Sequence, residues 1–105
     1  MALFDFFRPK IDSGVDEYAA TPGAVLLDVR SPGEFRRGRI PGSTNVPLQN
    51  IDVVEDVIAD KQVPLFVYCH SGSRSSRAVG ALMDMGFTNV RNLGGIAAYT
   101  GAVEV

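Results

Sequence analysis

The only cysteine and the only histidine of the chain are adjacent. A cysteine thiolate is a nucleophile and a metal ligand, but one cysteine with one histidine cannot supply a structural zinc site. A short loop of small and polar residues follows the cysteine: Cys69, His70, Ser71, Gly72, Ser73 and Arg74. Backbone N–H groups of such a loop can bind an anion and lower the pKa of a thiol. The pattern predicts a nucleophilic thiol with an anionic substrate, and the alternative is a cysteine that only packs.

The charge distribution favours the first interpretation. The chain has a net charge of −2, and ten of its twelve acidic residues lie in the first sixty positions. Between Lys61 and Val103 the only acidic residue is Asp84, while Arg74, Arg77 and Arg91 are basic. An acidic protein therefore keeps the segment around its thiol locally positive, which favours an anionic substrate and a thiolate. The overall acidity argues against nucleic acid as the main partner.

The elements that must position this thiol alternate along the chain. The apolar runs 24–29 and 64–69 are typical of strands buried on both faces, and shorter strands are predicted at 44–46 and 89–93. Between them we predict four helices, over 14–21, from an N-cap at Ser31 through Phe35, over 51–58 after a cap at Asn50, and over 75–86. Gly94 and Gly95 should form a last turn before a helical piece at 96–99.

This alternation indicates an α/β sandwich around a mostly parallel sheet. In such sheets ligands bind beyond the carboxyl ends of the strands. Cys69 is the last residue of a predicted strand, so the thiol is expected at the mouth of the loop, where the next helix begins.

Length and composition bound the other possibilities. A chain of 105 residues with 46% hydrophobic and 21% charged residues predicts one globular domain, over 11–105, and excludes disordered, collagenous and coiled-coil proteins. Residues 1–10 form an apolar lead-in, in which Leu3, Phe4, Phe6 and Phe7 are expected to fold back onto the domain. No apolar run reaches the ~20 residues of a membrane-spanning helix. The charge order of the lead-in is wrong for a secretory signal, so a cytoplasmic location is expected.

Three blocks, in order, resemble the rhodanese family of sulfurtransferases. They read LLDVRSPGEFRRGRIPGSTNVP, VYCHSGSRSSRA and VRNLGGI, and the resemblance covers about residues 12–101. It implies a three-layer α/β sandwich with a five-stranded, mostly parallel sheet flanked by helices. The sequence has no P-loop, no dinucleotide-binding glycine fingerprint and no metal-ligand spacing, so no cofactor and no metal are expected.

The resemblance implies that Cys69 is the catalytic nucleophile. The thiolate would take the outer sulfur of thiosulfate or a related small anionic donor, release sulfite and form a persulfide. Cyanide, a cellular thiol or a protein acceptor would then take the sulfur. The backbone amides of His70 through Arg74 would stabilise the negative charge. His70 departs from the arginine that is frequent in the family at this position.

The length of the loop distinguishes two branches of the superfamily. Four residues separate Cys69 from Arg74, as in the sulfurtransferases, whereas the related phosphatases have five. Position 75 is serine, so the phosphatase pattern is absent. The remaining alternatives are a sulfur-carrier or protein-interaction module with little thiosulfate turnover and a regulatory domain with an inert thiol. The intact cysteine disfavours the last.

Three residues are predicted to support the loop: Asp28, Arg30 and Glu34. Arg74 either contacts the anion or forms an ion pair with Asp28 or Glu34, and we favour the ion pair. Arg30 either joins a basic rim or forms a packing salt bridge, and the sequence leaves both open.

Overall fold

Four parallel strands form the centre of the molecule. The structure is a computed structural model that describes residues 8–105. The sheet has the order β2-β1-β3-β4, and each pair of neighbours is parallel. The strands are β1 (Val25–Asp28), β2 (Ser43–Asn45), β3 (Leu65–Cys69) and β4 (Val90–Gly95).

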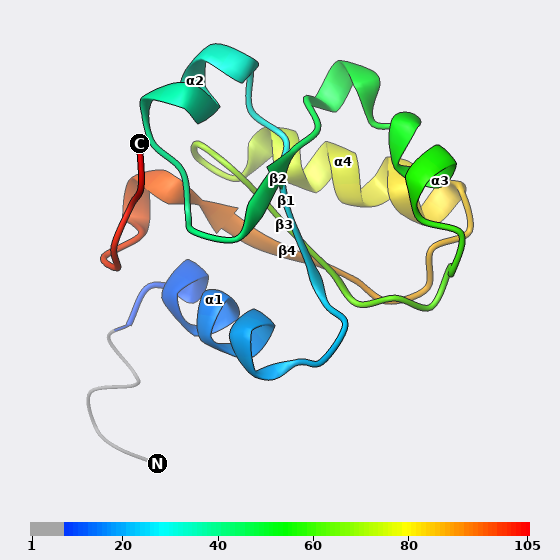
Figure 1. Ribbon diagram of the computed structural model, residues 1–105, viewed down its shortest axis with the longest axis horizontal. Helices are drawn as coiled ribbons and strands as arrows, with labels where there is room; N and C mark the ends of the chain where they lie inside the picture. The colour runs from blue at the N-terminus through cyan, green and yellow to red at the C-terminus, as the bar shows by residue number, and fades with distance from the viewer. Residues whose placement is uncertain (1–7) are drawn as a thin grey trace.

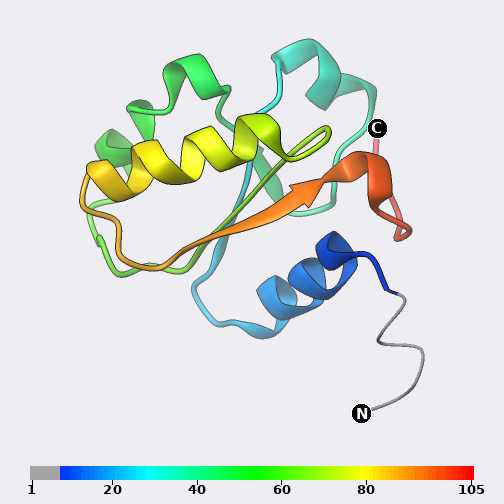
Figure 2. The same cartoon turned by 180° about the vertical axis from the view of Figure 1, so that it is seen from behind.

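Helices cover both faces of this sheet, as Figures 1 and 2 show from opposite sides. One face packs against α1 (Lys10–Ala20), and the other packs against α4 (Ser73–Asp84) and α3 (Val53–Val57). The short α2 (Pro32–Arg37) follows the carboxyl end of β1. The predicted three-layer α/β sandwich is therefore confirmed.

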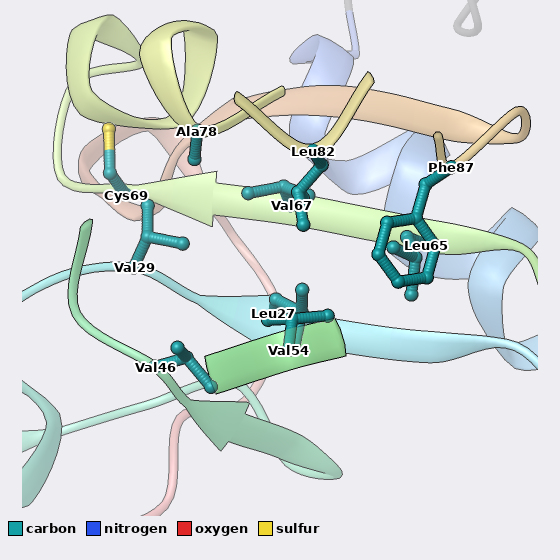
Figure 3. Packing of buried hydrophobic residues seen from close by; sticks show 10 residues of the cluster. All are labelled: Leu27, Val29, Val46, Val54, Leu65, Val67, Cys69, Ala78, Leu82 and Phe87. Carbon is teal, nitrogen blue, oxygen red and sulfur yellow. The ribbon is translucent and has the colours of Figure 1, made fainter. Parts of the chain in front are cut away.

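The central strand β3 divides its side chains between two cores. All five residues of β3 are buried. Leu65, Val67 and Cys69 belong to the core beneath α3 and α4, whereas Phe66 and Tyr68 belong to the core beneath α1. Successive side chains of a strand point to opposite faces, which explains the division. Cys69 thus lies on the α4 face of the sheet (Figure 3).

The first helix begins earlier than predicted. It starts at Lys10 after Pro9 and carries Gly14 in its interior, where the sequence suggested a start. Gly14 is buried against β4, and a Cβ there would lie 2.3 Å from Cδ2 of Leu93. Close packing on the sheet therefore explains a glycine inside the helix. Of the apolar lead-in, Leu3, Phe4, Phe6 and Phe7 lie outside the described residues.

The helix after β1 forms where the sequence places it. The hydroxyl of Ser31 accepts a hydrogen bond from the Glu34 backbone N–H at 3.2 Å, and the Glu34 carboxylate accepts one from the Ser31 N–H at 3.1 Å. These two bonds form a capping box, and Pro32 occupies the first turn. The helix ends at Arg37, two residues beyond the expected end.

The segment after β2 differs from the predicted helix over 51–58. A 3₁₀ turn, η2 (Leu48–Asn50), precedes a single α-helical turn, α3, and the side chain of Asn50 caps neither. Val54 is completely buried, whereas Val57 is 72% exposed. Pro47 starts the 3₁₀ turn, so only a short helix remains before the chain reaches β3.

Two further expectations were wrong at the carboxyl end. The described residues contain four strands and not five, and apart from these strands the only β pairing among them is one antiparallel bridge between Arg39 and Glu104. Gly94 and Gly95 belong to β4, and the 3₁₀ turn η3 (Ile96–Ala98) follows directly. Within residues 8–105, no helix combines the length and the apolarity needed to cross a bilayer.

Candidate active site

Cys69 lies at the base of a tight loop and not at its rim. It ends β3, the loop 70–72 follows, and α4 begins at Ser73. Cys69 is completely buried in the α4-side core, whereas His70, Ser71 and Ser73 are exposed around it. Figure 3 shows the sulfur beside the first turn of α4. The sequence predicted the thiol at the mouth of the loop. The structure places it below the mouth, because the side chains of Cys69 and Val67 both point into the core on the α4 side of the sheet.

The loop is closed onto the sulfur by a backbone hydrogen bond. The Gly72 N–H donates to the Sγ of Cys69 at 2.9 Å, and the thiol lies 3.4 Å from the hydroxyl oxygen of Ser75. Gly72 has a φ of +107°, which favours glycine, and this conformation turns the chain directly into α4. Ser73 and Arg74, predicted in the loop, are therefore the first residues of the helix.

These contacts decide the ionisation of the thiol. Burial alone raises the pKa of Cys69, but hydrogen bonds from Ser75, Gly72 and Ser71 lower it, and the net pKa is below its ordinary value. A lower pKa increases the fraction of thiolate, which is the nucleophilic form. The direction agrees with the one expected from the sequence.

Arg74 forms an ion pair with Glu34 and not with Asp28. Its guanidinium donates to both carboxylate oxygens of Glu34, at 2.7 and 3.0 Å, and so joins the first turn of α4 to α2. The hydrogen bond from Arg74 lowers the pKa of Glu34 to about 2. The ion-pair alternative for Arg74 is therefore confirmed, with Glu34 as the partner.

Asp28 pairs instead with Arg30, two residues along. The Arg30 guanidinium lies 2.7 Å from Asp28 and also donates to the Gly38 carbonyl at 2.6 Å. Asp28 is completely buried and Arg30 is 5% exposed, so this pair is internal and does not form a basic rim. It fixes the chain where β1 ends and α2 begins. Asp28 and Arg30 thus support the fold beside the loop, and of the three supporting residues Glu34 is the one that bonds to Arg74 at the start of α4.

On the α1 side of the sheet, opposite to Cys69, the buried hydroxyl of Tyr68 anchors β3 through two hydrogen bonds. It accepts a hydrogen bond from the Ile40 N–H at 3.1 Å and donates to the hydroxyl of Ser43 at 3.2 Å. Burial raises the pKa of Tyr68 to about 12, so the phenol remains neutral. The residue before Cys69 is held firmly by these two contacts.

The end of β4 forms the far wall of the loop. Gly95 lies so close to the loop that a Cβ would be 2.1 Å from the His70 carbonyl oxygen. Asn92, on the same strand, accepts the Gly94 N–H at 2.9 Å and contacts Ser75. The sequence pointed to Ser75 as the residue that breaks the phosphatase pattern, and it did not point to Asn92. The available signal was an asparagine inside a strand, where this residue type is depleted.

The geometry can be compared with known proteins. A family model described as "Rhodanese-like domain" matches residues 13–102. The protein named "Sulfurtransferase" of Allochromatium vinosum is 37% identical over 83 residues, which cover 77% of this chain and 76% of that protein. "Thiosulfate sulfurtransferase PspE" of Escherichia coli is 34% identical over 71 residues, 67% of this chain and 68% of the relative. Among solved structures, "rhodanese with anions from E. coli" aligns with a TM-score of 0.72 at 29% identity, and covers 77% of this chain and 96% of that one.

Proposed function

We propose that this protein, which belongs to the rhodanese-like domain family, is a sulfurtransferase that works through a persulfide on Cys69. The donor is thiosulfate or a related small anion, and the acceptor is cyanide, a cellular thiol or a protein-borne thiol. The observation that carries the proposal is the buried Sγ of Cys69, which accepts the Gly72 N–H at 2.9 Å. The active unit is residues 11–105 as one domain.

The first half-reaction forms one sulfur–sulfur bond and breaks another. The Cys69 thiolate attacks the outer sulfur of thiosulfate, and the electron pair of the broken bond leaves on sulfite. In the second half-reaction the acceptor attacks the terminal sulfur of the persulfide, and the electron pair returns to Sγ. No oxidant, reductant or cofactor is needed, and the two steps are separate, so ping-pong kinetics are expected.

The loop supports this chemistry by stabilising negative charge. The thiolate, the persulfide and the leaving sulfite are all anions, and preorganised N–H donors stabilise charge most strongly where water is excluded. The N–H groups of Ser71, Gly72 and Ser73 and the exposed ring of His70 are the groups we propose for binding the anion. The single thiol must remain reduced for the reaction, which favours the cytoplasm.

Intact-protein mass spectrometry tests the proposal directly. The chain has one cysteine, so a gain of one sulfur atom after incubation with thiosulfate reports on Cys69 alone. We expect this gain in the native protein, its removal by cyanide, and no gain in Cys69→Ser. The serine variant is a matched control because a hydroxyl oxygen can still accept the Gly72 N–H.

Two outcomes would contradict parts of the proposal. A sulfur gain in Cys69→Ser would overturn the mechanism. No gain in a folded native protein would overturn the thiosulfate donor and would favour the alternative, a sulfur carrier or interaction module that takes its sulfur from a partner protein.

A further inference from the structure

A buried hydroxyl lies among several acceptors behind the reactive sulfur. Ser75 is completely buried in the first turn of α4. Its Oγ lies 2.7 Å from Asn92 Oδ1, 3.0 Å from the Gly72 carbonyl oxygen and 3.4 Å from the Gly94 carbonyl oxygen. The sulfur of Cys69 is also 3.4 Å away. A serine hydroxyl has only one proton to donate, so these acceptors compete for it.

The amide of Asn92 has a fixed orientation in this competition. Its Oδ1 accepts the Gly94 N–H at 2.9 Å, and its Nδ2 donates to the Gly72 carbonyl at 3.5 Å. The oxygen therefore faces Ser75 and offers the shortest of the four contacts. While Cys69 is a protonated thiol, the Ser75 hydroxyl donates its hydrogen bond to Asn92 Oδ1. The Ser75 oxygen then accepts a hydrogen bond from the S–H of Cys69.

Asn92 reaches this place because it pairs in regular register with Val67 on the α4 side, and an irregularity follows it in β4. Val67 pairs with Asn92, but the next residue, Tyr68, pairs with Gly94, so Leu93 is an extra residue in the strand. Bulges of this kind re-aim side chains and are common beside active sites. Leu93 is buried in the α1-side core, while Asn92 contacts Ser75 on the α4 side.

We propose that Asn92 is a positioning residue that holds the single proton of Ser75 away from the Cys69 sulfur, and so sets how readily Cys69 ionises. The inference rests on the proposed function in taking Cys69 as the reacting sulfur. When Cys69 loses its proton, it can no longer donate to Ser75. The Ser75 hydroxyl must then leave Asn92 and turn to donate to the thiolate. In a persulfide the inner sulfur, Sγ of Cys69, carries no charge. The Ser75 hydroxyl then turns back and donates its hydrogen bond to Asn92 again.

The pH dependence of Cys69 alkylation by iodoacetamide tests this inference. Asn92→Ala removes the competing acceptor, so we expect the midpoint of the rate profile to fall by about half to one pH unit, the size of one net hydrogen bond. At pH values well below the midpoint the alkylation rate should rise about three- to tenfold. Asn92→Leu, which fills more of the space, should shift the midpoint in the same direction and serves if the alanine variant does not fold.

Two comparisons separate positioning from mere structural support. In a Ser75→Ala background, Asn92→Ala should no longer shift the midpoint, because the competing proton is gone. Asn89→Ala, an exposed asparagine just before β4, should leave the profile unchanged. A general loss of stability would lower the melting temperature in both backgrounds without this dependence on Ser75.

The inference is overturned if folded Asn92 variants keep or raise the midpoint, or if the shift is equally large without Ser75. Alkylation requires no sulfur donor, so this result is independent of whether thiosulfate forms a persulfide. A failed sulfur transfer with a shifted midpoint would contradict the proposed donor and leave the role of Asn92 intact.

Discussion

Replacing Glu34 by glutamine should weaken the join between α2 and α4 without disturbing the helix cap. The glutamine carbonyl can still accept the Ser31 N–H, so the capping box survives while the charge is lost. The guanidinium of Arg74 then keeps one hydrogen-bond partner and loses its ion pair. The substitution therefore isolates the electrostatic part of the interaction.

The magnitude follows from the pKa and the exposure of the pair. The pKa of Glu34 falls from 4.5 to about 2. At ~1.36 kcal/mol per unit, the full shift would correspond to about 3 kcal/mol of unfolding free energy. However, the side chains of Arg74 and Glu34 are 35% and 26% exposed, and solvent screens such pairs. We therefore expect a loss of ~1 kcal/mol, the upper end for exposed pairs, because this one is bidentate.

The loss should depend on pH in a defined window. The folded pKa of Glu34 lies below the unfolded one, so its stabilising contribution is complete above about pH 4.5 and is lost as the pH falls toward about 2. Urea denaturation at pH 7 and at pH 3 measures this. At pH 7 the melting temperature should also fall by about 4–8 °C, the shift typical of ~1 kcal/mol in a domain of this size.

Two variants serve as controls for this pair. Glu55→Gln removes a single-contact pair with Lys61 at 3.4 Å and should change stability by less than ~0.5 kcal/mol. Arg74→Ala should lower both the melting temperature and the rate of sulfur transfer, whereas Arg77→Ala, exposed on the same helix, should not. A difference between native protein and Glu34→Gln that stays constant from pH 7 to pH 3 would refute the electrostatic argument.

Three other measurements address the remaining contacts. The thiolate absorbance of Cys69 should titrate with a midpoint below the ~8.5 of a free thiol, and a value at or above it would contradict the role of the loop donors. Gly95→Ala should cost ~1–3 kcal/mol of unfolding free energy through its clash with the His70 backbone, whereas Gly80→Ala, in open space on α4, should gain ~0.5–1 kcal/mol; equal effects would argue against the close approach. Tyr68→Phe should cost ~1–3 kcal/mol at any pH from 5 to 9, since a buried N–H loses its acceptor, and a neutral result would show that this N–H finds another.

Local chemistry made much of the fold predictable from the sequence. The continuous apolar runs around Leu26 and Phe66 predicted buried strands, and Ser31 with Glu34 predicted the capping box. Both signals act over a few residues, so neighbours in the sequence are sufficient to identify them. The position of Cys69 at the end of a buried strand followed from the same reasoning.

Other features depend on residues that are distant in the sequence. The choice of Glu34 over Asp28 as the partner of Arg74 depends on where α2 packs against α4. The role of Asn92 depends on the register in which β4 pairs with β3 and on the packing of α4 above it, which bring Asn92 to Ser75. Gly14 was misjudged as a helix start because the residue it packs against, Leu93, lies far away in the sequence.

The parallel order of the strands has a consequence for the newly made protein. None of the four strands pairs with a neighbour through a tight hairpin, and β3 pairs with β1 through contacts such as Leu65 with Val25. Chains with such non-local pairing fold slowly, because long loops must close before contacts form. Cys69 is sheltered only when β3, β4 and α4 have all assembled, so the emerging chain carries an open thiol during its slowest stage. The hydrogen bonds that lower the pKa of Cys69 form only in the assembled structure, so the time course over which this pKa falls would record the completion of folding.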